Sequence, residues 1–225
     1  MKKIRILQIS FDDEIKQWEI PAFRGGIISK IGRDNVLFHN HIGDEDFRFA
    51  YPLIQYKAIA GKPAILCIEQ GVDEIHNFFQ NKDWSMSISG RKLEMKLDKL
   101  NMNQFTMQVW DTLFQYSIIN WLALNNENYP AFLKLTGMGE KISFLENILR
   151  ANILSFGKGI EWEVGDKINL QITNWNEPKL LPHKQQKLMA FAFNFKTNVF
   201  LPDFIGLGKG ASFGFGTVKK MRNEK

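Results

Sequence analysis

The stretch GLGKGASFGFG, Gly206–Gly216, decides how the second half of this sequence can fold. It places five of the 17 glycines within eleven positions, and a strand-like Thr217-Val-Lys-Lys follows. Glycine costs backbone entropy, so this density indicates a main chain that comes very close to something, often a phosphate. The segment predicts either a ligand-free hairpin or a flexible loop that grips a polyanion, with Lys209 for charge and Phe213 or Phe215 for stacking.

The residues before this segment alternate between strand and helix patterns. The clearest helix is 139–156, where Leu145, Leu149 and Ile153 lie on one apolar stripe. A short helix is predicted at 126–135, and strands at 105–119, 167–174, 187–198 and 213–220. The second half therefore fits the order strand, helix, strand, strand, helix, strand only loosely, because its second helix has to be very short.

The first half fits the same order more closely. Strands are predicted at 2–10, 49–59 and 64–70, helices from Pro21 to Ile31 and at 71–80, and one or two further strands in 85–100. This order is ferredoxin-like. The predicted class is α+β, with tandem ferredoxin-like (RRM-like) domains at residues 1–100 and 101–225 and a C-terminal glycine-rich loop.

Composition indicates a folded protein and excludes several other classes of protein. Hydrophobic residues make up 44% of the chain, which supports a core, and the net charge of +5 suits an acidic partner such as nucleic acid. The single cysteine, Cys67, excludes an internal disulfide and a zinc site made of cysteines, and its apolar surroundings predict a core residue. The polar N-terminus and the absence of long apolar windows predict a cytoplasmic protein without a membrane span.

Two of the four histidines, His39 and His41, stand two positions apart. In an extended chain they point to one side, roughly 6.5–7 Å apart, a spacing that can flank one phosphate. RNA cleavage by its own 2′-hydroxyl needs a base and an acid, and histidine suits both roles. Lys30 could stabilise charge on the phosphorane, and Tyr51 could hold a phosphate oxygen or a histidine.

Two other interpretations of the histidine pair stay open. A His-x-His pair is a common arm of a metal site, to which Asp44 and Asp46 could contribute. The pair could also lie in a polar surface loop without a role. The acid–base interpretation is favoured because the glycine segment and the positive charge agree with it.

Three segments together resemble a known family. They are Phe23-Arg-Gly-Gly-Ile-Ile-Ser-Lys30, the run from Leu37-Phe-His-Asn-His through Arg48-Phe-Ala-Tyr51-Pro to Gly61-Lys-Pro, and Gly206–Gly216. They are similar to segments of the CRISPR RNA-processing endoribonucleases of the RAMP superfamily, and more narrowly of the subgroup that uses two histidines. One departure is Ala50, which stands where the family often has a basic residue.

The resemblance implies a metal-independent endoribonuclease without a cofactor that cuts CRISPR repeat RNA, leaving a 2′,3′-cyclic phosphate and a 5′-hydroxyl. It implies His39 and His41 as the acid–base pair, assisted by Lys30 and Tyr51, with neither histidine assigned as base or acid. It also allows a CRISPR effector complex as a second partner and a homodimer. The implied RNA-binding residues are Gly206, Gly208, Lys209, Gly210, Ser212, Phe213, Gly214, Gly216, Arg24 and Lys57.

Two competing functions remain. Superfamily relatives that only bind RNA within an effector complex share the glycine loop, so the loop does not separate them from cleaving enzymes. A metal-dependent hydrolase outside CRISPR systems could instead use His39, His41 and an aspartate. Cleavage assays on repeat RNA with and without a chelator distinguish all three, because a non-cleaving subunit never cuts and a metal-dependent hydrolase loses activity on chelation.

Overall fold

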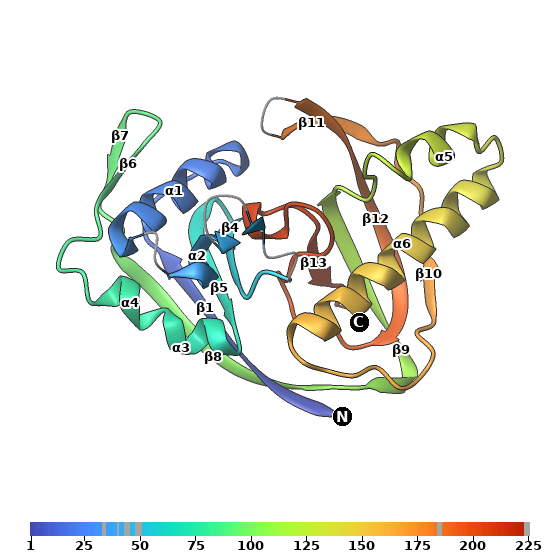
Figure 1. Ribbon diagram of the computed structural model, residues 1–225, viewed down its shortest axis with the longest axis horizontal. Coiled ribbons are helices and arrows are strands. Elements are labelled where there is room, and N and C mark those ends of the chain that lie inside the picture. The colour runs from blue at the N-terminus through green and yellow to red at the C-terminus, as the bar shows by residue number, and fades with distance from the viewer. Residues whose placement is uncertain (33–34, 40, 43–45, 48–50, 184–185, 223–225) are drawn as a thin grey trace. The chain divides into compact units, whose positions relative to one another are not determined.

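The computed structural model describes residues 1–32, 35–39, 41–42, 46–47, 51–183 and 186–222. For residues 39–47 within that set, and for His183, it describes the main chain alone. The chain forms two compact units (Figure 1). The N-terminal unit comprises Lys2–Thr106 together with Ser212–Gly214, and the C-terminal unit comprises Met107–Ala211 and Phe215–Lys225, with Met1.

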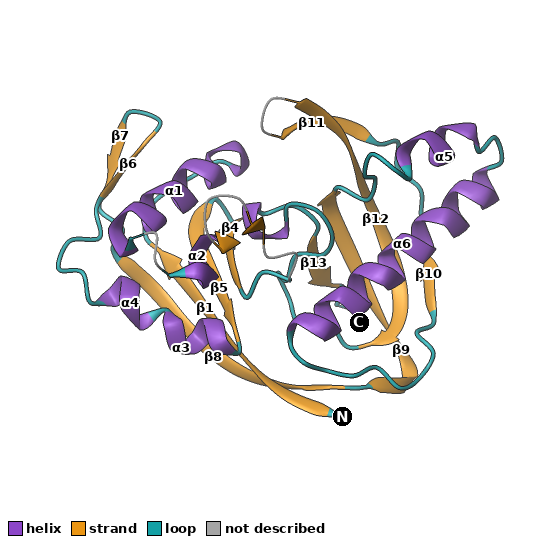
Figure 2. Ribbon diagram, viewed as in Figure 1, coloured by secondary structure: helices purple, strands orange, loops and turns teal. Residues whose placement is uncertain are grey.

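The N-terminal unit is built around a sheet in which β1, β4, β5 and β8 lie in the order β4-β5-β1-β8 (Figure 2). Its strands are β1 (Lys2–Phe11), β2 (His41–Ile42), β3 (Asp46–Phe47), β4 (Ile54–Ile59), β5 (Lys62–Ile68), β6 (Met86–Ile88), β7 (Arg91–Leu93) and β8 (Leu97–Met107). Its helices are η1 (Gln17–Glu19), α1 (Ile20–Ile31), α2 (Val36–His39), α3 (Gln70–Glu74) and α4 (His76–Phe79). In chain order the four sheet strands are second, third, first and fourth, which is the ferredoxin-like arrangement.

Aromatic rings fill the core under α1. Phe11 packs edge-on against Phe23 and Phe78, and Phe23 packs edge-on against Tyr56 at 5.7 Å between ring centroids. Cys67 is fully buried in β5, as its apolar surroundings predict. The predicted strand at 2–10 and helix from Pro21 to Ile31 are confirmed because each buries one side on this core.

The C-terminal unit repeats the same strand order. The strand order in its sheet is β10-β12-β9-β13, and β11 pairs with the first residues of β12 (Figure 2). The elements are β9 (Val109–Trp121), α5 (Tyr129–Lys134), α6 (Met138–Gly159), β10 (Leu170–Ile172), β11 (Lys179–His183), β12 (Gln186–Val199) and β13 (Thr217–Lys220). The 3₁₀ turn η2 (Ala211–Phe213) lies between β12 and β13, and its residues Ser212 and Phe213 belong to the N-terminal unit. Both units therefore have the antiparallel, mixed helix-and-strand architecture expected of tandem ferredoxin-like domains.

Helix α6 buries the predicted apolar stripe. Leu145, Leu149 and Ile153 are fully buried, and Glu146 on the same helix accepts a hydrogen bond from the Ile172 main-chain N–H at 2.9 Å. The helix thus covers the sheet and is joined to its edge strand β10. No helix in the described part of the chain is both long and apolar enough to cross a membrane.

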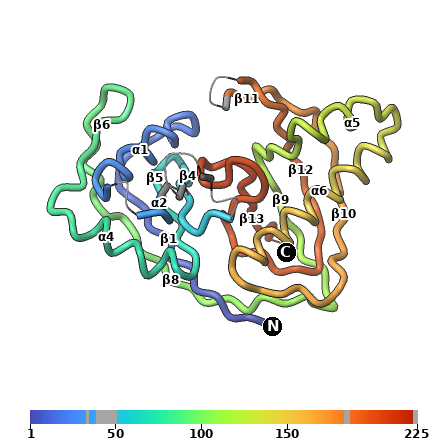
Figure 3. The backbone as a smooth tube through the Cα atoms, viewed as in Figure 1, coloured from blue at the N-terminus to red at the C-terminus, as the bar shows by residue number. Residues whose placement is uncertain are grey.

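At the place of the second helix, between β12 and β13, the chain has only the single 3₁₀ turn η2. Between β12 and β13 the chain instead forms the compact coil of the glycine segment, drawn in red in Figure 3. This agrees with the expectation that the helix at this place has to be very short.

Several predicted boundaries differ from the structure. The boundary at residue 100 falls inside β8, and the predicted strand 105–119 is interrupted at Gln108, between β8 and β9. The strand predicted at 49–59 begins only at Ile54, since Pro52 has no N–H to donate and its carbonyl accepts a hydrogen bond from Gln55; residues 49 and 50 lie outside the described residues.

The helix predicted at 71–80 is two short helices. The imidazole Nδ1 of His76 contacts the Asp73 carbonyl, and the Phe78 N–H bonds to the Ile75 carbonyl in a three-residue turn. Such side-chain competition for a carbonyl interrupts the regular helical ladder.

Candidate active site

His39 and His41 lie on two different elements. His39 is the last residue of α2, and His41 begins β2, where it is paired with Phe47 of β3. The stretch is therefore not one extended strand, and the spacing expected for an extended pair does not apply. The helical turn arises because Phe38 is drawn into the core, where 1% of it is exposed. The side chains of both histidines lie outside the described residues, as do Asp44 and Ala50.

The main chain next to His39 is held by Tyr56. The Tyr56 hydroxyl on β4 donates to the Phe38 carbonyl at 3.2 Å. Burial raises the pKa of Tyr56, so its hydroxyl stays protonated and able to donate. Sequence reasoning missed this contact, and the only signal was the position of Tyr56 within the segment that carries the family resemblance.

A second contact fixes the start of α2. The Asn35 side-chain amide donates to Glu74 Oε2 at 2.9 Å, and Asn77 donates to the same oxygen at 2.9 Å. The carboxylate thus joins the residue before α2 to α3 and α4. This contact and the Tyr56 hydrogen bond therefore hold α2 against β4 and α3 of the N-terminal unit.

Tyr51 is buried and faces a polar partner. Its hydroxyl oxygen accepts a hydrogen bond from the Gln55 side-chain amide at 2.9 Å. Burial raises the pKa of Tyr51, so the phenol is neutral. A neutral phenol can donate a hydrogen bond but cannot serve as a base near neutral pH.

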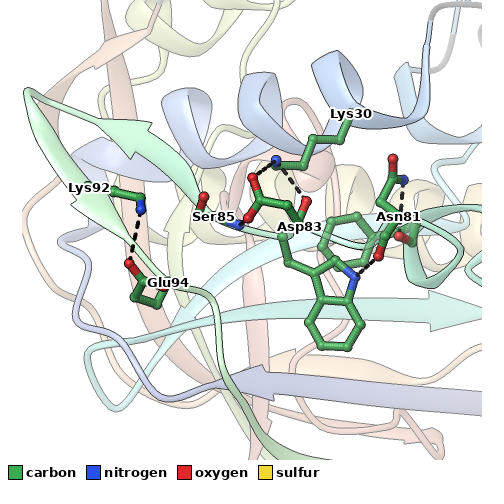
Figure 4. A network of polar contacts seen from close by, with 8 residues as sticks. Lys30, Asn81, Asp83, Ser85, Lys92 and Glu94 are labelled. Carbon is green, nitrogen blue, oxygen red and sulfur yellow. Dashed lines mark hydrogen bonds and ion pairs between the residues drawn. The ribbon is translucent and has the colours of Figure 1, made fainter.

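Lys30 lies in the last turn of α1 and reaches the loop between α4 and β6 (Figure 4). Its ammonium donates to the Asp83 carbonyl at 2.9 Å and lies 3.6 Å from the Asp83 carboxylate. Asp83 also accepts the Ser85 N–H at 2.9 Å; the hydrogen bonds from Ser85 lower the pKa of Asp83, with a smaller effect from Lys30. Lys30 therefore has a carboxylate partner in the folded chain.

The turn of the glycine segment at Ser212–Gly214 packs within the N-terminal unit. The Gln17 side-chain amide donates to the Gly214 carbonyl at 3.0 Å. The Arg24 guanidinium lies 4.5 Å from the centroid of the Phe213 ring, a cation–π geometry. Arg24 is largely buried, and burial lowers its pKa. The structure thus brings Arg24, Phe213 and Gly214 together.

The glycines of the segment are required by the protein's own packing. A Cβ at Gly216 would lie 1.9 Å from the Leu207 carbonyl oxygen, and one at Gly208 would lie 2.8 Å from Asn152 Oδ1 and Trp121 Nε1. Gly206, Gly210 and Gly214 would each meet an atom of the chain below 3.0 Å. Gly208, Gly210, Gly214 and Gly216 also have φ between +59° and +80°. Close approach to a ligand is therefore not needed to explain their density.

The two lysines expected to contact phosphate differ in exposure. Lys209 is exposed, and its main chain forms a β-bridge with Leu122 in the C-terminal unit. Lys57 on β4 is buried, with 2% exposed, and burial lowers its pKa to about 7. Among side chains that the structure describes, no group of three histidine, cysteine or acidic residues could hold a metal ion, and His39 and His41 are not in that set.

Two family models cover almost the whole chain. The model of the Cas6b N-terminal domain matches residues 2–106, and that of the Cas6b C-terminal domain matches residues 108–221. An uncharacterized protein of Methanocaldococcus jannaschii is 33% identical over 111 residues, which are 49% of this chain and 74% of that protein.

Solved structures share the fold of this chain. A Cas6b crystal structure superimposes with a TM-score of 0.89 at 25% identity, and one described as the CRISPR RNA processing endoribonuclease Cas6b with 0.74 at 23%; each match covers 98% of this chain and 100% of the other. A type IV Cas6 crRNA endonuclease shares the fold, with a TM-score of 0.59 at 10% identity and the same coverage. By the match of both domain models, this chain belongs to the Cas6b family.

Proposed function

We propose that this protein is a CRISPR RNA processing endoribonuclease that cleaves the repeats of pre-crRNA. The observation that carries the proposal is the match of both units to the two Cas6b domain models, over residues 2–106 and 108–221. The solved Cas6b structure whose description names this activity supports it. Binding of repeat RNA, delivery of the product to an effector complex and a homodimer belong to the same proposal.

In the proposed reaction the RNA supplies its own nucleophile, and no metal ion takes part. One of His39 and His41 removes the proton of the ribose 2′-hydroxyl, and the 2′-oxygen attacks the adjacent phosphorus. The bond from phosphorus to the 5′-oxygen breaks, and the other histidine donates a proton to that oxygen. The products are a 2′,3′-cyclic phosphate and a 5′-hydroxyl, so atoms and charges balance without water.

The contacts around α2 support this use of His39. Tyr56 and Glu74 hold the short helix at both its ends, so the main chain of His39 has a fixed place. Tyr51, buried and neutral, acts by positioning a neighbouring group through a hydrogen bond rather than by proton transfer. Lys30 stabilises the phosphorane only if its ammonium leaves the Asp83 carboxylate.

The glycine segment contributes to RNA binding through its side chains. Phe213, with Arg24 beneath it, offers a ring and a cation to the RNA, and Ser212 and Lys209 offer a hydroxyl and a charge. The glycines give the segment its shape. Lys57 is buried, so it does not contact a phosphate directly in this arrangement.

Labelled repeat RNA incubated with the protein and a chelator tests the proposal. We expect cleavage in the chelator, with a cyclic phosphate and a 5′-hydroxyl at the new ends. RNA with a 2′-deoxy nucleotide at the cut should bind but stay whole, because its nucleophile is missing. Cleavage of that deoxy substrate, or loss of cleavage on chelation, would contradict the mechanism. Binding without any cleavage would favour a non-cleaving RNA-binding subunit.

A further inference from the structure

A pocket of about 490 Å³ lies at one end of the C-terminal unit's sheet, and its lining includes none of the candidate site residues. Strand β9, the end of β13 with the two residues that follow it, and the loop before the glycine segment surround it. Its lining includes the side chains Leu113, Phe114, Asp203, Lys220, Met221 and Arg222. The volume is within the range of small-molecule sites.

Aromatic rings support one wall of this pocket. Phe114 packs edge-on against Trp110 at 6.1 Å and against Phe200 at 5.6 Å between centroids. The ring of Phe114 is half-buried, and 36% of Trp110 is exposed. The wall is therefore a fixed apolar surface that solvent still reaches.

Cations stand beside these rings. The Lys220 ammonium lies 5.4 Å from the Phe114 centroid and 5.2 Å from that of Phe200. Such cation–π contacts hold the flexible lysine at the pocket. Arg222 adds a second, exposed cation to the lining.

Main-chain hydrogen bonds fix the positions of these groups. The Met221 N–H donates to the Gln115 carbonyl at 2.9 Å, and the Lys220 N–H donates to Asp203 Oδ1 at 2.6 Å. Asp203 is the acidic residue of the lining, and one of its carboxylate oxygens is therefore already hydrogen-bonded to the main chain. With two cations and one acid, the lining carries a net positive charge.

We propose that this pocket binds one unpaired nucleotide of the RNA substrate. The base packs on the ring of Phe114, and Lys220 and Arg222 contact the flanking phosphate. An aromatic wall next to two cations matches a flat apolar base linked to an anion, which is how proteins bind single-stranded nucleic acid. The inference rests on the proposed function, because it requires that RNA is the substrate.

Variants of two lining residues, with a matched control, test the pocket. Phe114→Leu removes the ring but keeps an apolar side chain, and Lys220→Met removes the cation. Lys219→Met is the control, because successive residues of β13 point to opposite faces and Lys219 is also exposed. The probe is repeat RNA with a 2′-deoxy nucleotide at the cut, so that binding is measured by fluorescence anisotropy without cleavage.

We expect Phe114→Leu to weaken binding about tenfold, the effect of losing one stacked base. Lys220→Met should weaken binding. It should also make the negative slope of log affinity against log salt shallower by about 0.7, the effect of losing one phosphate contact. Lys219→Met should leave the contribution of the pocket to RNA affinity unchanged. Equal affinities of Phe114→Leu, Lys220→Met and Lys219→Met would overturn the inference.

Photocrosslinking supplies a second measurement that does not depend on a substituted ring. Wild-type protein bound to RNA carrying 4-thiouridine should crosslink in the peptides that contain Phe114 or Met221. Crosslinks confined to other peptides would overturn the pocket assignment. If RNA is still cleaved in that case, the proposed function stands while the pocket does not; if the wild type neither binds nor cleaves RNA, both fail.

Discussion

The hydroxyl of Tyr56 and the carbonyl of Phe38 form a 3.2 Å hydrogen bond one residue before His39. Replacing Tyr56 by Phe leaves a buried carbonyl without its donor, which costs on the order of 1 kcal/mol of unfolding free energy. It also loosens the helical turn that ends at His39. We expect the single-turnover cleavage rate to fall between about tenfold and a hundredfold, with unchanged RNA affinity.

Tyr116→Phe is the matched control for this variant. Its hydroxyl oxygen accepts the Leu201 N–H at 2.8 Å, so the change also deletes a buried hydrogen bond, but in the C-terminal unit. We expect a similar loss of stability without a loss of cleavage rate. Equal rates for Tyr56→Phe and wild type would show that Tyr56 does not position the site.

His39→Ala and His41→Ala should each slow cleavage by about 10²–10⁴-fold, the usual contribution of a general acid or base. The variants should also differ in pH dependence, because a base must be neutral and an acid must be protonated. The variant that loses the base no longer gains rate as pH rises through the acidic range; the variant that loses the acid no longer loses rate at high pH. Rate–pH profiles at saturating RNA measure this difference and assign the roles.

His76→Ala controls for a change of residue type, because His76 lies exposed on α4. It should cleave like the wild type. A pair of His39 and His41 variants with full activity would rule out the acid–base role.

The ion pair of Lys30 with Asp83 separates a catalytic role of Lys30 from a structural one. Asp83→Asn removes the carboxylate charge but keeps the main-chain carbonyl that Lys30 also contacts at 2.9 Å. If Lys30 stabilises the phosphorane, Lys30→Ala slows cleavage, while Asp83→Asn keeps or raises the rate because the ammonium is released. Cleavage rates that fall equally in both variants would instead indicate that the ion pair only supports the loop.

Lys57 predicts a dependence of stability on pH. Burial lowers its pKa to about 7, whereas an unfolded lysine has a pKa of about 10.4. Between these values the unfolded chain binds more protons, so Lys57 makes stability rise with pH from about 7 to about 10.4. The slope from one such group is at most about 1.4 kcal/mol per pH unit.

Lys57→Met should remove this slope, and it should raise stability most at pH 7 and below. Urea unfolding at several pH values gives the free energies for wild type and variant. Lys92→Met, an exposed lysine of the same unit, is the control and should keep the slope. Parallel curves for Lys57→Met and wild type would contradict the prediction.

The glycine segment predicts a contrast between two alanine variants. Gly216→Ala places a Cβ 1.9 Å from a carbonyl oxygen at a φ of +59°, so we expect a loss of about 3 kcal/mol or more. Gly25→Ala in α1 meets nothing within 4 Å, so it should stabilise by about 0.5–1 kcal/mol. Thermal unfolding measures both, and equal midpoints would contradict the packing argument.

Sequence periodicity predicted the elements that bury one face. Strand β1 and helices α1 and α6 appear where the apolar pattern placed them, and the two strand–helix orders gave the correct fold class. Boundaries depended on hydrogen bonds that no pattern encodes. The break at Ile75 arises from a side-chain contact between His76 and Asp73, and the late start of β4 from Pro52 and Gln55.

The sequence predicted the residue types of the candidate site, but it did not predict the hydrogen bonds that position them. His39 and His41 stand out in the sequence, whereas Tyr56 supports them through a bond between residues 18 positions apart, which only the folded chain brings together. The glycine density correctly indicated close approach of the main chain. It could not indicate that the approach is to Leu207, Trp121 and Asn152 of the same chain.

The replacement of a helix by the coil between β12 and β13 limits how this protein can be engineered. A helix accepts many side chains on its outer face, but here five glycines leave little space for any substituent. Tags, labels or grafted loops are better inserted at the hairpin turn Ser89–Gly90, where a Cβ on Gly90 meets no atom within 4 Å.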